Sequence, residues 1–231
     1  MNMDTKQTRI AIFFDGSFFL QVNSFYKHNH SVGKSFFFSG FMDYIRHKVA
    51  HQEHSKYVHC PVVESIWFKG RYAANALESR FPDPQKRIDA VNSERKTEDS
   101  LVYHGVKLHY YPIHLDNETQ EPLDKSINVQ FTAEAVAAAA QDRFDVLVIM
   151  GGDGELQHLV SKVNFFGKRV MVLGFNLTYE AETMYGPKRK FIRSSHALME
   201  KANYAVWMDR IIDEGLANDE RLIMGLFNNM I

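Results

Sequence analysis

Two aspartates follow short apolar segments of the chain, in a pattern that suits chemistry at the ends of buried strands. Asp15 follows residues 10–14, and Asp153 follows residues 146–150 after two glycines, with Glu155 two residues further on. Carboxylates held close together repel each other, and a bound cation relieves that repulsion. Oxygen ligands favour Mg²⁺ or Mn²⁺, ions that activate water and offset charge on a phosphate.

The segments around these acids alternate between expected strands and expected helices. Predominantly apolar runs predict five core strands, at residues 10–14, 62–68, 106–111, 146–150 and 170–173. Helices are expected at residues 17–28, 40–54, 85–103, 131–141 and 156–165, and two C-terminal helices at 195–208 and 211–228. This alternation predicts an α/β fold with a mainly parallel, doubly wound sheet.

The order of the strands decides whether the acids meet. In a doubly wound sheet with the order 3-2-1-4-5, strands one and four are neighbours, so Asp15 and Asp153 converge at the switch point where ligands bind. An aspartate after a strand is also a common turn residue or helix cap, which is the simpler interpretation of either one alone. Two aspartates at matching strand ends favour a metal site.

The bulk properties restrict the class of protein. The chain has 231 residues, a net charge of −1 and a pI near 6.8, so any nucleic-acid contact must come from a local basic patch. Cys60 is the single cysteine, which excludes an internal disulfide and suits a reducing compartment. Residues 1–9 lack an apolar signal core, and no apolar run is long enough to span a bilayer. We expect a cytoplasmic protein with no membrane partner.

The densest group of basic residues lies late in the chain, in a segment that we expect to be a loop at residues 186–193. Together with three basic residues further upstream, this group could line the route of a phosphate backbone. The group consists of Lys188, Arg189, Lys190 and Arg193, and the upstream residues are Lys69, Arg71 and Lys168. Runs of charge are often interaction surfaces, although any one such residue is most simply a solvated surface residue.

Several segments resemble, in order, the NYN domain, a branch of the PIN-like nucleases. The opening strand and Asp-Gly turn are matched by residues 12–20, IFFDGSFFL. The family's Lys-Gly-Val-Asp-Val segment is matched by residues 125–129, KSINV, and its Ser-Gly-Asp-x-Asp-Phe segment by residues 147–160. The glycine turn at residues 167–170 and a closing helix at residues 195–203 extend the resemblance over about residues 9–207.

The resemblance implies a PIN-like three-layer fold and a metal-dependent endoribonuclease, a hydrolase that uses Mg²⁺ or Mn²⁺. Asp15 and Asp153 match the family's metal-binding aspartates, Glu155 stands at an Asp position, and Glu134 stands where the family helix often has Asp. Asn128 departs from the pattern: it keeps one oxygen but loses the charge, which should weaken metal binding. An attenuated module that binds RNA or protein without cleavage is therefore the alternative.

Two further residues of the family-like segments are expected near the substrate. Lys125 precedes Asn128 and either balances the acidic pocket, touches the scissile phosphate or is an exposed residue before a helix. Ser17 follows the Asp-Gly turn, where it also suits a helix cap.

Other motifs point elsewhere. Residues 151–154, Gly-Gly-Asp-Gly, resemble the signature of NAD kinases and diacylglycerol kinases, whose glycines let a nucleotide phosphate approach the backbone. Those kinases place a large second domain after the motif, whereas about fifty residues follow Gly174 here. His47, His51 and His54 have helical spacing, but no further ligand completes a recognised zinc motif.

The end of the chain is expected to be an appendage. We expect one NYN/PIN-like domain over residues 1–210 and a helical appendage over residues 211–231. Four apolar residues of this appendage are expected to be exposed, and an exposed apolar surface suggests a homodimer. They are Leu222, Ile223, Leu226 and Phe227.

Overall fold

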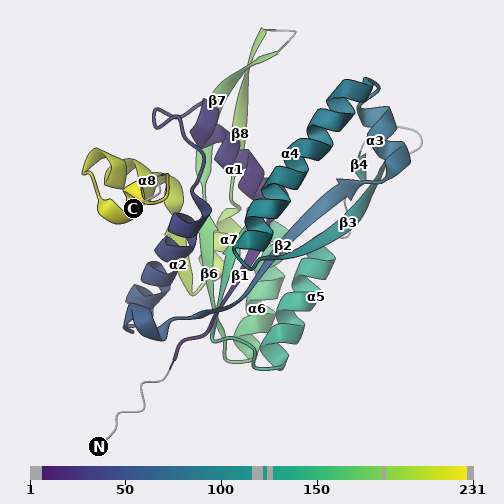
Figure 1. Ribbon diagram of the computed structural model, residues 1–231. Coiled ribbons are helices and arrows are strands. Elements are labelled where there is room, and N and C mark those ends of the chain that lie inside the picture. Colours follow the sequence, from purple (N-terminus) through teal and green to yellow (C-terminus); the bar gives the residue numbers. More distant parts are fainter. Residues whose placement is uncertain (1–6, 116–121, 124–126, 184–185, 228–231) are drawn as a thin grey trace, which may run out of the picture.

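The computed structural model describes residues 7–115, 122–123, 127–183 and 186–227 (Figure 1). Seven strands form the main sheet, in the order β4-β3-β2-β1-β5-β6-β9. They are β1 (Ile10–Asp15), β2 (Val62–Tyr72), β3 (Lys107–Leu115), β4 (Pro122–Leu123), β5 (Val146–Met150), β6 (Arg169–Gly174) and β9 (Tyr204–Trp207). All neighbouring pairs are parallel except β3 and β4. The predicted five-strand order is confirmed as β3-β2-β1-β5-β6, and β4 and β9 extend it at the two edges.

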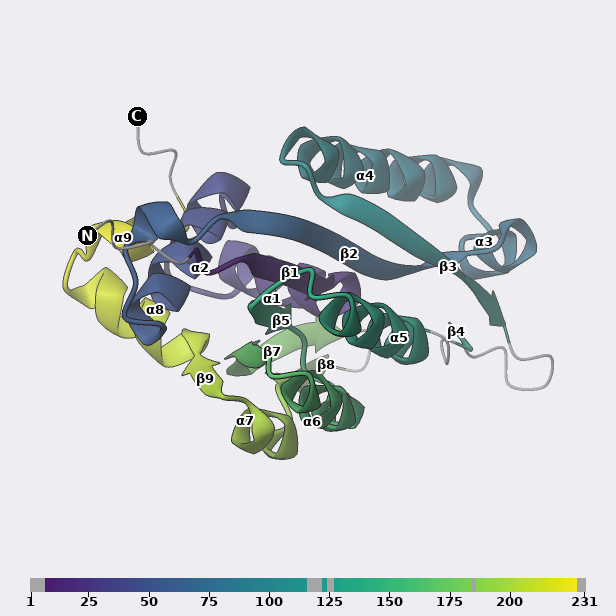
Figure 2. The ribbon, with the colours of Figure 1, turned by 90° about the horizontal axis from the view of Figure 1, so that it is seen from below.

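Helices cover both faces of the sheet, which makes three layers (Figure 2). The helices are α1 (Gly16–His28), α2 (Phe38–Gln52), α3 (Ala74–Arg80), α4 (Pro84–Tyr103), α5 (Ile127–Ala140), α6 (Gln157–Phe165), α7 (His196–Lys201), α8 (Met208–Ala217) and α9 (Arg221–Met224). Two single 3₁₀ turns are η1 (Tyr57–His59) and η2 (Gly154–Leu156). Side chains of α1, α2, α8 and α9 share one apolar cluster, and those of α5, α6 and α7 share another.

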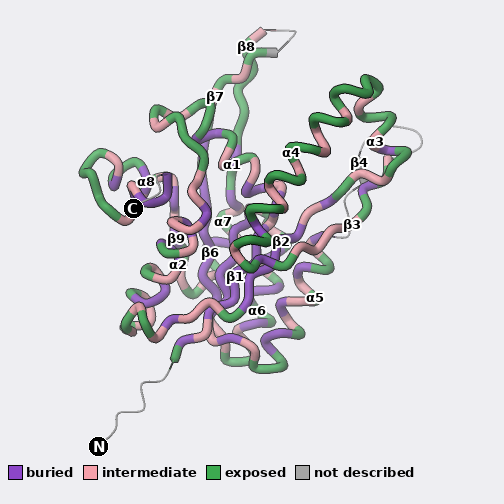
Figure 3. The backbone as a smooth tube through the Cα atoms, viewed as in Figure 1, coloured by how far each residue is buried: buried purple, intermediate pink, exposed green. Residues whose placement is uncertain are grey.

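Strand β1 shows why the apolar runs become buried strands. Successive side chains of a strand point to opposite faces. Ile12 and Phe14 therefore join the cluster beneath α1 and α2, while Phe13 joins the cluster beneath α5 and α6. All three are fully buried, and the buried centre of the molecule follows these strands (Figure 3). A strand covered on both faces needs the uniform apolar sequence that predicted it.

The predicted basic loop is a strand instead. Residues Gly186–Arg193 form β8, which pairs antiparallel with β7 (Asn176–Thr183) in a separate two-stranded hairpin. Figure 1 shows this hairpin projecting from the same end of the molecule as α3 and α4. Leu177 and Ile192 face each other at its base and are buried in the main core. Elsewhere charged residues occupy both faces of β8, and they hide the strand pattern.

The two predicted C-terminal helices are also corrected. The expected helix at residues 195–208 ends at Lys201, and the chain then forms β9, which pairs with β6 at the sheet edge. The expected helix at residues 211–228 stops at Ala217, and Asp219 takes a positive φ of 52° before α9 begins. A four-residue strand between helices is too short to produce a periodic signal of its own.

The last helices pack onto the same chain. Ile223, Leu226 and Phe227 are buried, and Leu222 is partly buried against the same cluster. The Phe227 ring lies 5.2 Å from that of Phe36, centroid to centroid, and the Phe37 amide donates to the Leu226 carbonyl at 2.7 Å. These residues therefore do not form the exposed contact surface from which a homodimer was predicted. The division into domains at residue 210 stays a prediction.

An ion pair fixes the start of β1 to the start of β5. Asp145 accepts hydrogen bonds from the Arg9 amide at 2.8 Å and from Arg9 Nε at 3.1 Å. Burial raises the pKa of Asp145, but the hydrogen bonds and charge of Arg9, with the charge of Lys168, outweigh it and leave this pKa below its usual value. The pair thus stabilises the fold while Asp145 is ionised.

We expect Asp145→Asn to lower the free energy of unfolding by about 1–2 kcal/mol at neutral pH, because partly exposed charged hydrogen bonds are screened. A carboxylate with a lowered folded-state pKa stabilises above the unfolded pKa, about 4, and this contribution disappears as the pH falls through the folded value. Urea midpoints measured from pH 7 down to about 3 should therefore converge for variant and wild type. A gap that stays constant over this range would contradict the assignment.

Candidate active site

The acidic residues Asp15 and Asp153 lie at the same edge of the sheet. Strands β1 and β5 are parallel neighbours, with Phe14 opposite Met150, so the two strands end side by side. A Cβ placed on Gly151 would lie 3.6 Å from the Cβ of Asp15. The fold thus brings Asp15 next to the loop that carries Asp153, at the predicted switch point. Asp15 also caps α1, since its Oδ1 accepts a hydrogen bond from the Phe18 amide at 3.1 Å.

Asp153, Glu155 and Asn128 form a second part of this edge. Asn128 lies in the first turn of α5, and its Nδ2 donates to Asp153 Oδ2 at 2.6 Å and toward Glu155 Oε2 at 3.3 Å. Asp153 Oδ1 accepts from the Glu155 amide at 2.8 Å and so caps η2. Both carboxylates are exposed to solvent. One amide group therefore bridges two carboxylates. A cation that prefers oxygen ligands could contact the same two carboxylates in its place.

The glycines of the Gly-Gly-Asp-Gly segment are explained by packing. A Cβ on Gly152 would lie 2.6 Å from the Phe18 ring and 2.8 Å from the Arg193 carbonyl oxygen, closer than real Cβ atoms approach. The Gly152 carbonyl accepts from the Ser195 amide at 2.9 Å. A Cβ on Gly154 would lie 2.9 Å from Ser195 Oγ. Contacts within the chain thus account for these glycines without a nucleotide phosphate, which removes the main support for the kinase interpretation.

Glu134 has a different set of partners from the other acids. Its Oε1 accepts from Arg143 at 3.1 Å, and the same guanidinium bonds to Glu64, which is 7% exposed. Lys107 bonds to Glu64 as well, at 2.7 Å. The structure thus places Glu134 in an ion-pair network that ties α5 to β2. Its assignment to the catalytic group stays a prediction.

Glu134→Gln tests this placement. If Glu134 serves the network, its neutral variant should lose roughly 1–2 kcal/mol of stability, because a charged hydrogen bond to Arg143 is weakened, and should bind Mn²⁺ as the wild type does. Thermal unfolding and calorimetric titration with Mn²⁺ separate the two effects. A fall in Mn²⁺ affinity without a loss of stability would instead place Glu134 at the metal.

Three of the predicted substrate-binding residues line one groove. Ser17, Lys69 and Arg71 border a cavity of about 450 Å³ between the end of β2 and α4. Lys69 Nζ pairs with Glu94 at 2.5 Å, while Arg71 pairs with Glu94 at 3.3 Å and with a second glutamate, Glu98. The groove thus holds the predicted cations, but α4 neutralises their charge.

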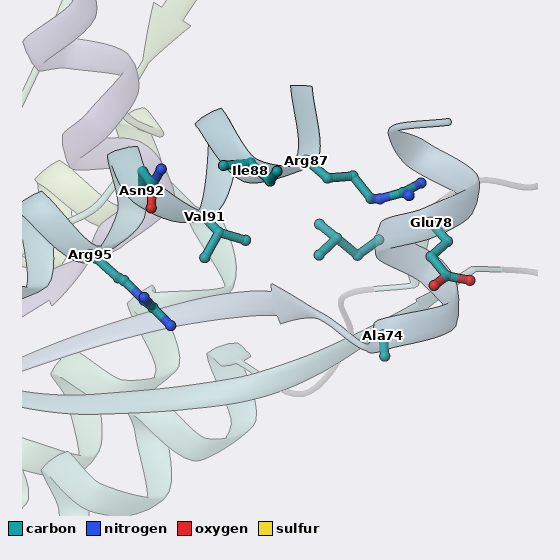
Figure 4. A pocket seen from close by; sticks show the side chains of 8 residues that line it. Ala74, Glu78, Arg87, Ile88, Val91, Asn92 and Arg95 are labelled. Carbon is teal, nitrogen blue, oxygen red and sulfur yellow. The ribbon is translucent and has the colours of Figure 1, made fainter. Parts of the chain in front are cut away.

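The other predicted basic residues are differently placed. Lys188, Arg189 and Lys190 are exposed on β8, and none of them forms an ion pair within the described part of the chain. Lys125 lies outside the described residues. A second pocket, of about 410 Å³ between α3 and α4, is lined by Arg87, Ile88 and neighbouring side chains and contains none of the predicted site residues (Figure 4).

A family comparison extends these observations. The family model of the NYN domain matches residues 9–186. The chain belongs to the NYN domain family. The resemblance noted in the sequence is thereby confirmed, together with the α/β fold of a PIN-like nuclease, although this match ends at Gly186 while the predicted resemblance continued to residue 207. The part of β8 after Gly186, and everything after it, therefore lies beyond the family match.

Comparison with solved structures supports the fold of this NYN chain. A protein of unknown function from Vibrio parahaemolyticus has a TM-score of 0.51 and 21% identity, and the match covers 90% of this chain and 97% of the other. At this identity the likeness concerns the fold alone. No curated protein matches the chain. Among the described helices of the NYN chain, none is long and apolar enough to cross a membrane.

The donor atoms of the NYN site are of the kind that a hard divalent ion requires. Within the described residues, no group of three or more His, Cys, Asp or Glu side chains already has a metal-binding arrangement. Asp153 and Glu155 nevertheless reach one amide, Asp15 lies beside their loop, and every donor that these residues offer to a cation is oxygen. This chemistry fits Mg²⁺ or Mn²⁺, which take few protein carboxylates and keep several waters.

Proposed function

We propose that this NYN domain is a metal-dependent endoribonuclease that hydrolyses RNA phosphodiester bonds. One observation carries the proposal: Asp153 and Glu155 share the Asn128 amide at the switch point of the sheet, next to Asp15. Ligands of open parallel sheets bind at this point. The family to which the chain belongs supports a nuclease-type fold.

Each acid has a defined part in the proposed site. Asp15, Asp153 and Glu155 would hold Mg²⁺ or Mn²⁺, with the side-chain oxygen of Asn128 available after rotation of its amide. When bound, such an ion supplies an activated water and offsets charge on the scissile phosphate. The capping bonds from the Phe18 and Glu155 amides each engage one oxygen of an aspartate and so fix the orientation of the two carboxylates.

The remaining predicted residues are proposed to bind substrate. A phosphate backbone requires positive charge, which Lys188, Arg189 and Lys190 offer without forming ion pairs to any carboxylate among the described residues. Lys69 and Arg71 could contact phosphate only if they released Glu94 and Glu98, so we give them the smaller part. RNA is the proposed partner.

The direct test is cleavage of a labelled, unstructured RNA by the wild-type protein in Mn²⁺, in Mg²⁺ and in EDTA. Internal cleavage that requires the divalent ion and proceeds for many turnovers is the expected result. Intact RNA in all three conditions, with protein of verified folding, would overturn the proposal.

A second candidate, a module that binds RNA without cleavage, is favoured by the same amide. Asn128 places a neutral donor where the family segment has Asp, and its hydrogen bonds satisfy Asp153 and Glu155 without any cation. RNA binding that is unaffected by EDTA, combined with no cleavage in Mn²⁺, would establish this second function.

A further inference from the structure

We propose that the solvent-exposed face of β8, called the outward face below, binds single-stranded RNA and guides it toward the carboxylates of Asp15, Asp153 and Glu155. We call this binding surface the track. The track consists of Arg189, Phe191 and Arg193. The inference deepens the proposed function and rests on it for the identity of the ligand. Arg189 and Arg193 belong to the predicted basic group, whereas Phe191 did not figure among the predicted binding residues. The whole of β8 after Gly186 lies beyond the family match.

The base of the hairpin is fixed directly to the loop that carries Asp153. The Arg193 carbonyl lies against Gly152, and the next two residues bond to the glycines. Ser194 Oγ donates to the Gly151 carbonyl at 3.3 Å, and the Ser195 amide donates to that of Gly152 at 2.9 Å. A ligand lying along β8 from its tip to Arg193 therefore arrives beside the carboxylates.

The two faces of the hairpin have different environments. On one face Leu177 and Ile192 are buried, and Tyr179 packs against Phe25 of α1 with ring centroids 5.7 Å apart. Lys190 is the cross-strand neighbour of Tyr179, so it belongs to this inner face, and Lys188 lies two residues from it on the same face. The alternate positions, which include the three track residues, are exposed. Only the outward face is therefore open along its full length.

The track combines an aromatic ring with available cations. Phe191 is 49% exposed, and the Arg193 guanidinium lies 4.2 Å from the centre of its ring. Within the described residues Arg189 and Arg193 form no ion pair, in contrast to Arg71 in the groove under α4. Glu180 lies opposite Arg189 on the same face without forming an ion pair with it, so it moderates the local charge but does not neutralise it.

These features favour unpaired RNA. Side chains two apart on a strand are about 6.6 Å apart, a separation that suits successive units of an extended nucleic-acid strand. An exposed aromatic ring flanked by cations can stack an unpaired base while the cations contact phosphate. In a duplex the base faces are already stacked on each other and cannot reach such a ring. The hairpin therefore discriminates by strandedness.

Binding experiments test the track apart from catalysis. Fluorescence anisotropy in EDTA, where the proposed cleavage cannot proceed, would measure the affinity for a short unstructured RNA and for the same strand in a duplex. Phe191→Leu is expected to weaken binding of the single strand roughly ten-fold, the lower part of the range for loss of one stacked base. Duplex affinity should change less than about two-fold, since it depends on phosphate contacts.

Matched variants give the control. Arg189→Gln and Arg221→Gln remove the same charge from two exposed positions, one on the track and one on α9. The track predicts a clearly larger loss of single-strand affinity for Arg189→Gln, whereas simple charge attraction predicts equal losses. Phe165→Leu alters an 82% exposed ring on α6 and should leave the affinity for single-stranded RNA unchanged. Equal losses for the two charge variants, or unchanged single-strand affinity in Phe191→Leu, would overturn the inference. Normal track binding without any cleavage in Mn²⁺ would instead overturn the proposed nuclease and leave the track standing.

Discussion

Replacement of Asp153 by Asn is expected to abolish calorimetrically detectable Mn²⁺ binding and to reduce RNA cleavage by more than about a hundred-fold. Residues that only orient metal ligands are worth about 10–100-fold, so a direct carboxylate ligand should be worth more. The exchange is nearly isosteric. The amide oxygen of Asn can still accept the 2.8 Å bond from the Glu155 amide, so the loop should keep its shape.

The Asp153→Asn result needs a control for charge and for folding. Asp99→Asn makes the same change at an exposed position of α4 and should leave metal binding and cleavage at the wild-type level. Far-ultraviolet circular dichroism and thermal unfolding should be alike for both variants. Cleavage by a well-folded Asp153→Asn protein at the wild-type rate would remove Asp153 from the proposed mechanism.

The opposite exchange, Asn128→Asp, is expected to make the fold depend on a divalent ion. Asn128 now donates to Asp153 and Glu155. A carboxylate in its place would lose both bonds and add a third negative charge, and like charges at this spacing repel. We expect the melting temperature to fall in EDTA and to recover in Mn²⁺, with Mn²⁺ affinity and cleavage each raised roughly ten-fold or more by the added ligand charge.

Differential scanning measurements with and without Mn²⁺ would check this. Asn92→Asp places the same new charge on an exposed position of α4 and should show no ion-dependent shift. If Asn128→Asp were as stable as the wild type in EDTA and no tighter for Mn²⁺, then Asn128 would lie outside the cation site. A rise in cleavage would show that the wild-type amide attenuates an otherwise competent site.

The central strands could be predicted from the sequence because burial on both faces restricts their residues to apolar types. Residues in β1 and β5 are covered on both faces, and only apolar side chains satisfy that environment. Strand β8 escaped prediction because only Ile192 is buried, and four of its eight residues are charged. Strand β9 escaped because four edge residues between helices carry too little periodicity.

The candidate site divides in the same way. The meeting of Asp15 with the loop after β5 follows from strand order, which the alternation of elements suggests. The partners of Glu134 do not follow from any local pattern, since its network joins α5 to Glu64, which lies 79 residues before Arg143 in the chain. The sequence of a helix that resembles the family segment does not show whether its carboxylate faces a metal ion or an arginine.

The bonds between the acidic loop and the hairpin base also impose an order on biosynthesis. Asp15, Asp153 and Glu155 have all been made by the time Gly186 is added. The carbonyls of Gly151 and Gly152 find their partners only when Ser194 and Ser195 follow. Chains fold as they emerge from the ribosome, N-terminal parts first. The nascent polypeptide thus carries Asp15, Asp153 and Glu155 for some time before the residues that brace the loop exist, and maturation of the site waits until Ser194 and Ser195 have been added.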